Sequence, residues 1–447
     1  MSTGTISGCA AIIIILFLYC FPVATNYFDN YAVKGTADHF VIPAFGQEEE
    51  EQLSLPQLND QALRIEPVVE GGLLFPTSMV FVDNDTLLVT QKDDGNTIVI
   101  INGTVKSQPV ISVEVENRAT RGLLGITAVQ KPSTSSSDNT KLVFLYYTES
   151  YGQDQVRNRV YRYEWDQENQ MLVNATMVLN LPADPGPGHN GGKIEADKNA
   201  TIYAVIGDLF REGGQLQNVP EGPADEDSSV IIRITQDGSA VADNPFFNSS
   251  NEWMQKYYAY GIRNSFGLAI DPISGLLWDT ENGDESYDEM NIVRPGFNSG
   301  WNKIMGPISH SDIQQADLEE ELMIFEGSKY ADPVFSWEES VGVTDLEFLN
   351  STALGPKYAY NLFIGDINNG NLYYFELNDN RAGIKFDAND LEEDLTDQVA
   401  DDDEELSHIV FGSGFEEGIT DIETGPDGFL YVLTFNGSIY RILPATN

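Results

Sequence analysis

The chain has 447 residues, with 24 Lys and Arg against 70 Asp and Glu, and its formal net charge is -46. Such an acidic protein repels phosphate backbones and anionic lipid surfaces, so we expect no nucleic-acid partner. Hydrophobic residues make up 41% of the chain and aromatic residues 11%. That share supports a real hydrophobic core and excludes a disordered acidic protein.

The N-terminal segment is an apolar run without charge. No charged side chain precedes Asp29, and residues 9–24 are apolar throughout. This run is shorter than the roughly 20 residues of a transmembrane helix and is typical of a signal-peptide core. Because the usual basic flank is missing, a membrane anchor through residues 9–24 is the alternative. We expect residues 1–29 to be a signal peptide or membrane anchor and the protein to be extracytoplasmic, secreted or anchored to the outer face of the cell membrane.

The remaining chain has features of an exported protein. Both cysteines, Cys9 and Cys20, lie in the apolar run, so the rest of the chain has no thiol for a zinc–thiolate site or a nucleophile. Residues 30–60, with their run of glutamates, are predicted to form an acidic tether. Seven Asn-x-Ser/Thr triplets support an extracytoplasmic surface: Asn84, Asn102, Asn174, Asn199, Asn248, Asn350 and Asn436.

A weak strand–turn–strand unit recurs six times after the tether. Each copy alternates apolar and polar residues between Gly, Asn and Asp turns, which is a strand signal. The copies cover residues 80–101, 141–165, 193–208 with 230–234, 268–293, 361–377 and 425–442. Six such units predict an all-β fold, a six-bladed β-propeller with four-stranded antiparallel blades over residues 61–447. A β-sandwich or a two-domain β protein is the alternative.

His189 lies in the glycine-rich segment 186–192, ahead of a strand that ends at Asp208. Glycines allow close approach of the backbone to a ligand, and a histidine on such a loop can act as a general base. Asp208, one strand away, is placed to orient it. A structural histidine that caps the loop is an equally good interpretation from spacing alone.

Two further segments carry candidate ligand-binding residues. Arg263 and Asn264 lie in a glycine-bounded loop, where an Arg-Asn pair can hold a ligand oxygen or a developing negative charge. An arginine that bridges blades by salt bridges is the alternative. Residues 280–291 cluster carboxylates and turn carbonyls, which are ligands that suit calcium. Their spacing is not that of an EF-hand, and a plain acidic turn would look the same.

Together these segments resemble the soluble pyrroloquinoline-quinone (PQQ)-dependent sugar dehydrogenases, the glucose/sorbosone dehydrogenase family. The resemblance covers roughly residues 65–443. It rests on segments 121–125, 158–160, 189–192, 207–208, 261–264, 288–291, 296–301 and 425–428. The family fold is a six-bladed propeller, which agrees with the repeat count.

The resemblance implies a role for each candidate residue. His189 would remove the proton of a sugar hydroxyl while hydride passes to the quinone, and Asp208 would support His189. Arg263 would polarise the quinone, and Asn264 would contact it. Calcium, bound partly by the backbone carbonyls of Gly283 and Asp284, would hold and activate PQQ.

The chain departs from the family pattern at the quinone anchor. A lysine and two arginines that hold the tricarboxylate are replaced by Asn368, Gly418 and Thr420, a glutamine contact becomes Thr120, and the proline at the calcium becomes Asp284. Each charge-assisted contact is typically worth about 1.5–3 kcal/mol, so this loss weighs against PQQ binding.

Three functions therefore remain open. The first is an exported, quinoprotein-like oxidoreductase, a PQQ-dependent sugar (aldose) dehydrogenase-like enzyme that acts on a small-molecule sugar or alcohol. The second is a non-catalytic glycan- or protein-binding propeller that has lost the quinone cradle. The third is a hydrolase or lactonase-type propeller that uses His189 and calcium, for which no separate motif speaks.

Overall fold

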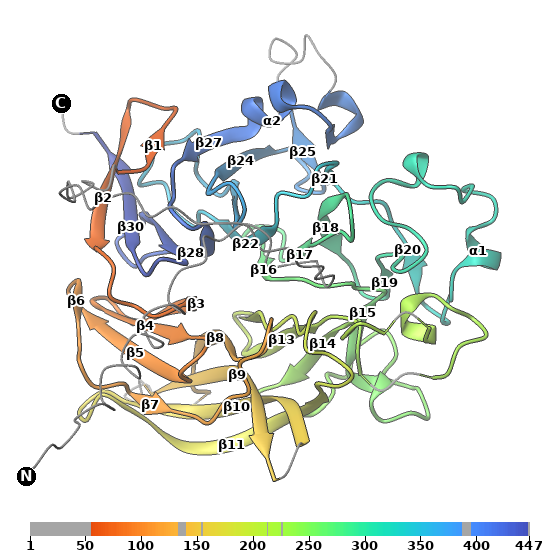
Figure 1. Ribbon diagram of the computed structural model, residues 1–447, viewed down its shortest axis with the longest axis horizontal. Helices are drawn as coiled ribbons and strands as arrows, with labels where there is room; N and C mark the ends of the chain where they lie inside the picture. Colours follow the sequence, from red (N-terminus) through yellow and green to blue (C-terminus); the bar gives the residue numbers. More distant parts are fainter. Residues whose placement is uncertain are drawn as a thin grey trace, which may run out of the picture. The chain divides into compact units, whose positions relative to one another are not determined.

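Short strands make up most of the regular structure (Figure 1). The computed structural model describes residues 55–132, 140–152, 155–211, 213–224, 227–386 and 395–445, and within these ranges the strands form six sheets. Gly, Asn and Asp turns separate the strands because these residues adopt the backbone conformations that tight turns require. The signal or anchor segment and the tether as far as residue 54 lie outside the described residues.

Each sheet runs from an inner strand to outer strands at its far edge. The sheet that begins with β3 contains β3 (Pro76–Asp83), β4 (Thr86–Gln91), β5 (Asn96–Ile101) and β6 (Thr104–Val105), with β7 (Ile111–Ser112) paired to β5. The next contains β8 (Leu123–Gln130), β9 (Lys141–Tyr151), β10 (Gln155–Asp166) and β11 (Met171–Pro182). The third contains β12 (Ile194–Ala196), β13 (Thr201–Ile206), β14 (Val230–Thr235), β15 (Tyr257–Tyr260), β19 (Phe297–Asn298) and β20 (Lys329–Tyr330).

The other three sheets follow the same plan. The fourth contains β16 (Gly267–Ile270), β17 (Leu277–Glu281), β18 (Asp288–Val293), β21 (Phe335–Trp337) and β26 (Val399–Ala400). The fifth contains β22 (Val343–Phe348), β23 (Leu362–Asp366), β24 (Leu372–Leu377), β27 (Val410–Ser413) and β1 (Gln57–Leu58), with β25 (Ile384–Lys385) paired to β24. The last contains β28 (Ile419–Thr424), β29 (Leu430–Thr434), β30 (Ile439–Pro444) and β2 (Leu63–Val69).

The inner strands close into a ring. β3 contacts β8, β8 contacts β12, β12 contacts β16, β16 contacts β22, β22 contacts β28, and β28 returns to β3. The last sheet is completed by β2 from the N-terminal side, which pairs antiparallel with β30 so that Leu63 lies opposite Pro444. This pairing joins the two ends of the described chain within one sheet.

Every pair of neighbouring sheets has its own hydrophobic core. Separate buried clusters fill the six interfaces between consecutive sheets. Strands in the middle of a sheet are therefore covered on both faces, and every residue of β4 and of β13 is buried. Face-to-face packing of sheets around a ring is the propeller architecture, so the prediction of an all-β propeller is confirmed.

Helices are short in the described residues. The α-helices are α1 (Leu318–Glu321) and α2 (Asp403–Ile409), and 3₁₀ turns occupy Gln215–Gln217, Met254–Lys256, Ile308–His310 and Leu395–Asp397. The Asp402 side chain caps α2 by accepting from the backbone N–H groups of Glu404 and Glu405. Among the described residues, none of the helices is both long and apolar enough to cross a membrane.

The antiparallel connections place the candidate residues at one end of the ring. The loop before an inner strand and the loop after the second strand of a sheet lie at the same end, because the two strands run in opposite directions. His189 precedes β12 and Asp208 follows β13, while Arg263 precedes β16 and Gly283 follows β17. The fold thus gathers loops from neighbouring sheets, as propellers do at their binding faces.

Candidate active site at the loop end of the propeller

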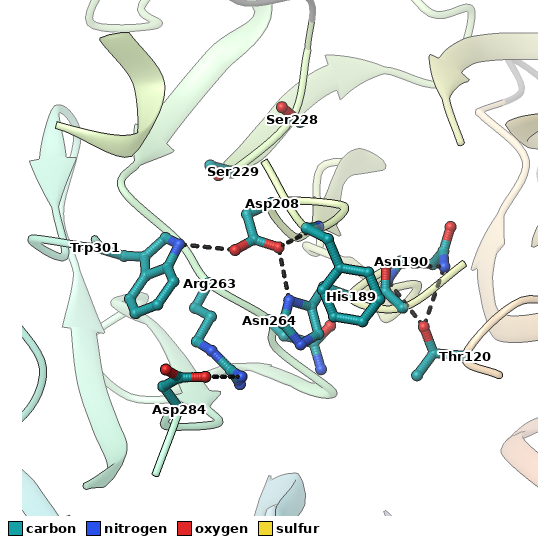
Figure 2. Close-up of polar contacts among 12 residues, drawn as sticks. Thr120, His189, Asn190, Asp208, Ser228, Ser229, Arg263, Asn264, Asp284 and Trp301 are labelled. Carbon is teal, nitrogen blue, oxygen red and sulfur yellow. Dashed lines mark hydrogen bonds and ion pairs between the residues drawn. The ribbon is translucent and has the colours of Figure 1, made fainter. Parts of the chain in front are cut away.

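His189 and Asp208 form a buried pair. His189 Nδ1 lies 2.6 Å from Asp208 Oδ1 (Figure 2), and the two residues are 8% and 1% exposed. With the proton on Nδ1, where the carboxylate can accept it, Nε2 is the acceptor nitrogen of the ring. The pair that the sequence spacing suggested therefore has the geometry of an oriented base.

Asp208 is held by two further donors. The backbone N–H of Phe210 donates to Oδ1 at 2.8 Å, and the indole N–H of Trp301 donates to Oδ2 at 2.8 Å. A carboxylate that accepts three hydrogen bonds is fixed in position and satisfied although it is buried. The sequence pointed to Asp208 but not to these partners.

Hydrogen bonds that involve backbone groups connect the loops of the site. The Asp208 N–H donates to the Arg263 carbonyl at 2.8 Å, and the Gly191 N–H donates to Asn264 Oδ1 at 3.2 Å. A Cβ on Gly207 would lie 2.5 Å from the Arg263 oxygen and 2.6 Å from the His189 oxygen. Only glycine allows this approach, so Gly207 lets the His189 loop and the Arg263 loop pack closely against it.

A buried polar network supports the His189 loop from the neighbouring sheet. Thr120 Oγ1 accepts from the Asn190 backbone and side-chain amides, both at 3.1 Å. Asn190 Oδ1 accepts from Asn158 Nδ2 at 2.9 Å, and Asn158 Oδ1 accepts from the Thr148 hydroxyl at 2.7 Å. Thr120, which was expected only as a departure from the family pattern, thus anchors the residue next to His189 (Figure 2).

The Arg263 guanidinium is bound by residues 282–284 of the acidic segment 280–291. Its Nη1 donates to the Gly283 carbonyl at 2.5 Å and the Asn282 carbonyl at 3.2 Å. Its Nη2 lies 2.7 Å from Asp284 Oδ1 (Figure 2). The Arg263 side chain is 9% exposed, whereas that of Asp284 is 59% exposed. The structure therefore places Arg263, Gly283 and Asp284 together, with the arginine at the carbonyl that was expected to bind calcium.

Buried carboxyl groups lie behind Arg263. Glu281 Oε1 accepts the Arg263 backbone N–H at 2.7 Å, and its Oε2 accepts the Ser299 hydroxyl at 2.7 Å. Burial raises the pKa of Glu281 to about 7, and burial holds the pKa values of Asp279 and Glu289 well above their usual range. Charged carboxylates are costly there, so this group favours its protonated forms.

Asp288, in the predicted calcium segment, organises the loop backbone. Its Oδ1 accepts the Gly283 N–H at 2.9 Å, and its Oδ2 accepts the N–H groups of Gly342 and Val343 at 2.6 and 3.0 Å. Burial raises its pKa. These contacts explain an acidic residue at this position by turn structure alone.

The calcium expected here does not fit the arrangement of the side chains. A guanidinium already donates to the Gly283 carbonyl, and a second cation at that oxygen would be repelled. Among the described residues, no group of three or more His, Cys, Asp or Glu is spaced to hold a metal ion. The assignment of calcium to Gly283 and Asp284 stays a prediction, and it requires Arg263 to move.

The anchor positions for PQQ do not fit a tricarboxylate either. Asn368 offers an amide, and its Nδ2 lies 3.4 Å from the Ser340 carbonyl. Thr420 offers a hydroxyl, 3.5 Å from the Leu433 carbonyl. Gly418 has φ +86°, and a Cβ there would lie 2.3 Å from the Ile367 oxygen. An arginine at position 418 would need a different backbone conformation. The cation is therefore missing at this position, and the backbone of Ile367 also leaves no room for its side chain.

Sequence reasoning missed the residues that act through contacts between distant loops. Trp301 reaches Asp208 across 93 positions, and its ring also lies 5.4 Å from the Arg263 guanidinium carbon. The only signal for it was its place in segment 296–301 of the family resemblance. Phe210 and Glu281 carried no signal beyond lying near Asp208 and in the acidic segment.

Comparisons with known proteins agree with this architecture. The chain is 28% identical to aldose sugar dehydrogenase YliI of Escherichia coli over 271 residues, 60% of this chain and 64% of that protein. The apo-form crystal structure of the soluble E. coli aldose sugar dehydrogenase is 24% identical, with a TM-score of 0.64, over 86% of this chain and all of that one. The PQQ-bound aldose sugar dehydrogenase from Streptomyces coelicolor is 20% identical, with a TM-score of 0.61, over 87% of this chain and 99% of that one.

The solved structures show the fold, and a family model adds the relationship by sequence. The model described as "Glucose / Sorbosone dehydrogenase" matches residues 73–441, which include all of the candidate site. The match runs from β3 to β30, the sheets that form the ring. The resemblance noted in the sequence is confirmed: the chain belongs to the glucose/sorbosone dehydrogenase family.

Proposed function

We propose that the chain is an exported oxidoreductase that acts on a hydroxyl group of a sugar or alcohol, with His189 as the general base. The observation that carries this proposal is the buried pair of His189 Nδ1 and Asp208 Oδ1 at 2.6 Å. Asp208 holds the Nδ1 proton, so Nε2 can take the proton of a substrate hydroxyl. The six sheets and their six separate cores support a six-bladed propeller as the scaffold.

Arg263 and Asn264 would stabilise the charge that develops when the hydroxyl proton leaves. A guanidinium and an amide that are fixed by the loop backbone stabilise negative charge without reorganisation. The Asn264 side-chain oxygen accepts from the N–H of Gly191, two residues after His189. This hydrogen bond fixes the two loops relative to each other. Arg263 would first have to break its ion pair with Asp284 before it could contact the substrate.

Alcohol oxidation also needs a hydride acceptor. The family implies PQQ beside calcium, which supplies that acceptor when bound. In this chain Asn368, Gly418 and Thr420 do not fit the quinone's carboxylates, and Gly283 is engaged by Arg263. The proposal therefore rests on the proton-transfer half of the reaction. The first experiment tests whether PQQ serves as the hydride acceptor.

A second function is favoured by the same departures. A non-catalytic propeller that binds a glycan or a protein would keep the loop scaffold and dispense with the quinone cradle. The ion pair between Arg263 and Asp284 supports this alternative, because it neutralises the cation that the chemistry would use.

The deciding experiment is a titration of the full chain with PQQ, with and without millimolar calcium, followed by absorbance and heat. A dye-linked screen of aldoses and alcohols follows in the same samples. We expect turnover of at least one aldose and a loss of about 10²–10⁴-fold in His189→Asn, the usual contribution of a positioned base. No quinone binding up to near-millimolar concentration and no turnover would leave the binding propeller.

A further inference from the structure

Phe210 is a large aromatic side chain at the edge of the candidate site. It is 52% exposed, although it follows a fully buried leucine. The centroid of its ring lies 4.4 Å from that of His189, with the rings edge to face at 61°. Phe210 is therefore about half exposed to solvent while its ring contacts the candidate base.

The surrounding chain is built to hold this ring in place. Leu209 and Phe210 have φ values of 58° and 60°, a left-handed conformation that non-glycine residues rarely adopt. The Phe210 N–H donates to Asp208 Oδ1 at 2.8 Å. A Cβ on Gly188 would lie 2.1 Å from Phe210 Cζ, so the loop before His189 leaves room for the ring. Strained backbone at such a place indicates a functional constraint.

We propose that Phe210 is the stacking platform for the ring of an uncharged cyclic sugar, and that it selects cyclic aldoses over open-chain polyols. The inference rests on the proposed function and names the residue that would hold its substrate. Pyranose rings present faces of C–H groups that pack on aromatic faces, and their hydroxyls project from the ring edge. Because the Phe210 and His189 rings are in contact, a sugar laid on Phe210 brings an edge hydroxyl to the imidazole.

The charge of the chain favours the same class of ligand. A net charge of -46 disfavours anionic sugars and organic acids. The positions expected to hold carboxylates carry Asn368, Gly418 and Thr420, which are neutral. A neutral sugar is not repelled, and burial of the phenyl face supplies affinity without charge.

The test measures binding separately from turnover. Dissociation constants for D-glucose and a panel of neutral aldoses are determined by saturation-transfer difference NMR on the full chain, with the open-chain polyol sorbitol as the comparison. We expect Phe210→Ala to weaken aldose binding about tenfold or more, as loss of an aromatic contact typically does. Phe210→Leu, which keeps an apolar side chain without the ring, should also bind weakly, and Phe210→Trp should restore affinity.

Trp253→Ala serves as the matched control. Trp253 is 44% exposed on the loop between β14 and β15, away from the site loops. Equal aldose affinity in the wild type and Phe210→Ala overturns the platform, as does equal affinity for sorbitol and the aldoses or no aldose binding at all. Comparison of aldose binding with turnover in the wild type and Phe210→Ala separates the two proposals. Aldose binding that depends on Phe210 without any turnover contradicts only the oxidoreductase, and turnover that ignores Phe210 contradicts only the platform.

Discussion

Trp301 donates its indole N–H to Asp208 Oδ2 at 2.8 Å, on the carboxylate whose other oxygen binds His189. The Arg263 guanidinium carbon lies 5.4 Å from the centroid of the same tryptophan ring. The Trp301 side chain thus contacts both Asp208, the partner of the candidate base, and the Arg263 guanidinium (Figure 2). We therefore expect Trp301 to act as a positioning residue for the candidate site.

Replacing Trp301 with phenylalanine removes the N–H and keeps an aromatic ring. A charge-assisted hydrogen bond is worth about 1.5–3 kcal/mol, so we expect kcat for an aldose substrate to fall about tenfold or more. KM should change little, because Trp301 acts through Asp208. Steady-state kinetics of Trp301→Phe beside Trp253→Phe test this, and a change confined to KM would show that Trp301 contacts the substrate instead.

Removing the Asp284 carboxylate should release Arg263 without unfolding the protein. The Asp284 side chain is 59% exposed, so the ion pair contributes less than about 1 kcal/mol to the free energy of unfolding. We expect Asp284→Ala to bind anionic ligands such as PQQ more tightly, measured by calorimetry. Asp243→Ala is the matched control, because it removes an exposed carboxylate from the mostly buried Arg233. Equal gains in both variants would mean that only net charge matters.

Restoring two of the cradle cations tests whether the site is a lost quinone site. We expect Asn368→Lys combined with Thr420→Arg to raise PQQ affinity at least tenfold, because each charge-assisted contact is worth about 1.5–3 kcal/mol. The neutral pair Asn368→Gln and Thr420→Gln is the control for size. Gly418→Arg should instead destabilise the fold, since its backbone has φ +86° and a Cβ would lie 2.3 Å from Ile367 O. Unchanged affinity in the cationic double variant would argue against a quinone at these loops.

Asp279 should make stability fall as pH rises. It is completely buried beside Asn291, neither carboxyl oxygen has a well-formed hydrogen bond, and burial holds its pKa well above the usual range. The native state keeps the proton between the unfolded pKa of about 3.9 and the raised folded value, whereas the unfolded state loses it. Stability from this group is therefore present at low pH and is lost as pH rises towards the folded pKa.

Asp279→Asn has no proton to lose, so its stability relative to the wild type should increase with pH. We expect the gain to be larger at pH 8 than at pH 5, by about 1.4 kcal/mol for each pH unit over which only the unfolded Asp279 is ionised. Urea unfolding at the two pH values measures it. Asp237→Asn, at an exposed position paired with Arg162, is the control. A pH-independent difference would show that Asp279 does not titrate in this range.

The repeat units were predictable because strand and turn signals are local. The six sequence copies fall in six different sheets, for example residues 80–101 in β3–β5 and 425–442 in β29 and β30. Burial does not alternate along every strand as the sequence pattern predicts, since β4 and β13 are buried on both faces. Packing against two neighbouring sheets requires apolar side chains on each side of a central strand.

The sequence by itself determined the strand-rich propeller, the family and the residue types at His189, Asp208 and Arg263, because periodicity and short motifs are written in adjacent positions. Only the tertiary structure decided that Trp301 binds Asp208, that Phe210 lies against His189 and that Arg263 is held by Asp284. Each of these contacts joins loops that follow or precede different strands. Their side-chain directions depend on how the sheets pack around the ring, which residue spacing does not encode.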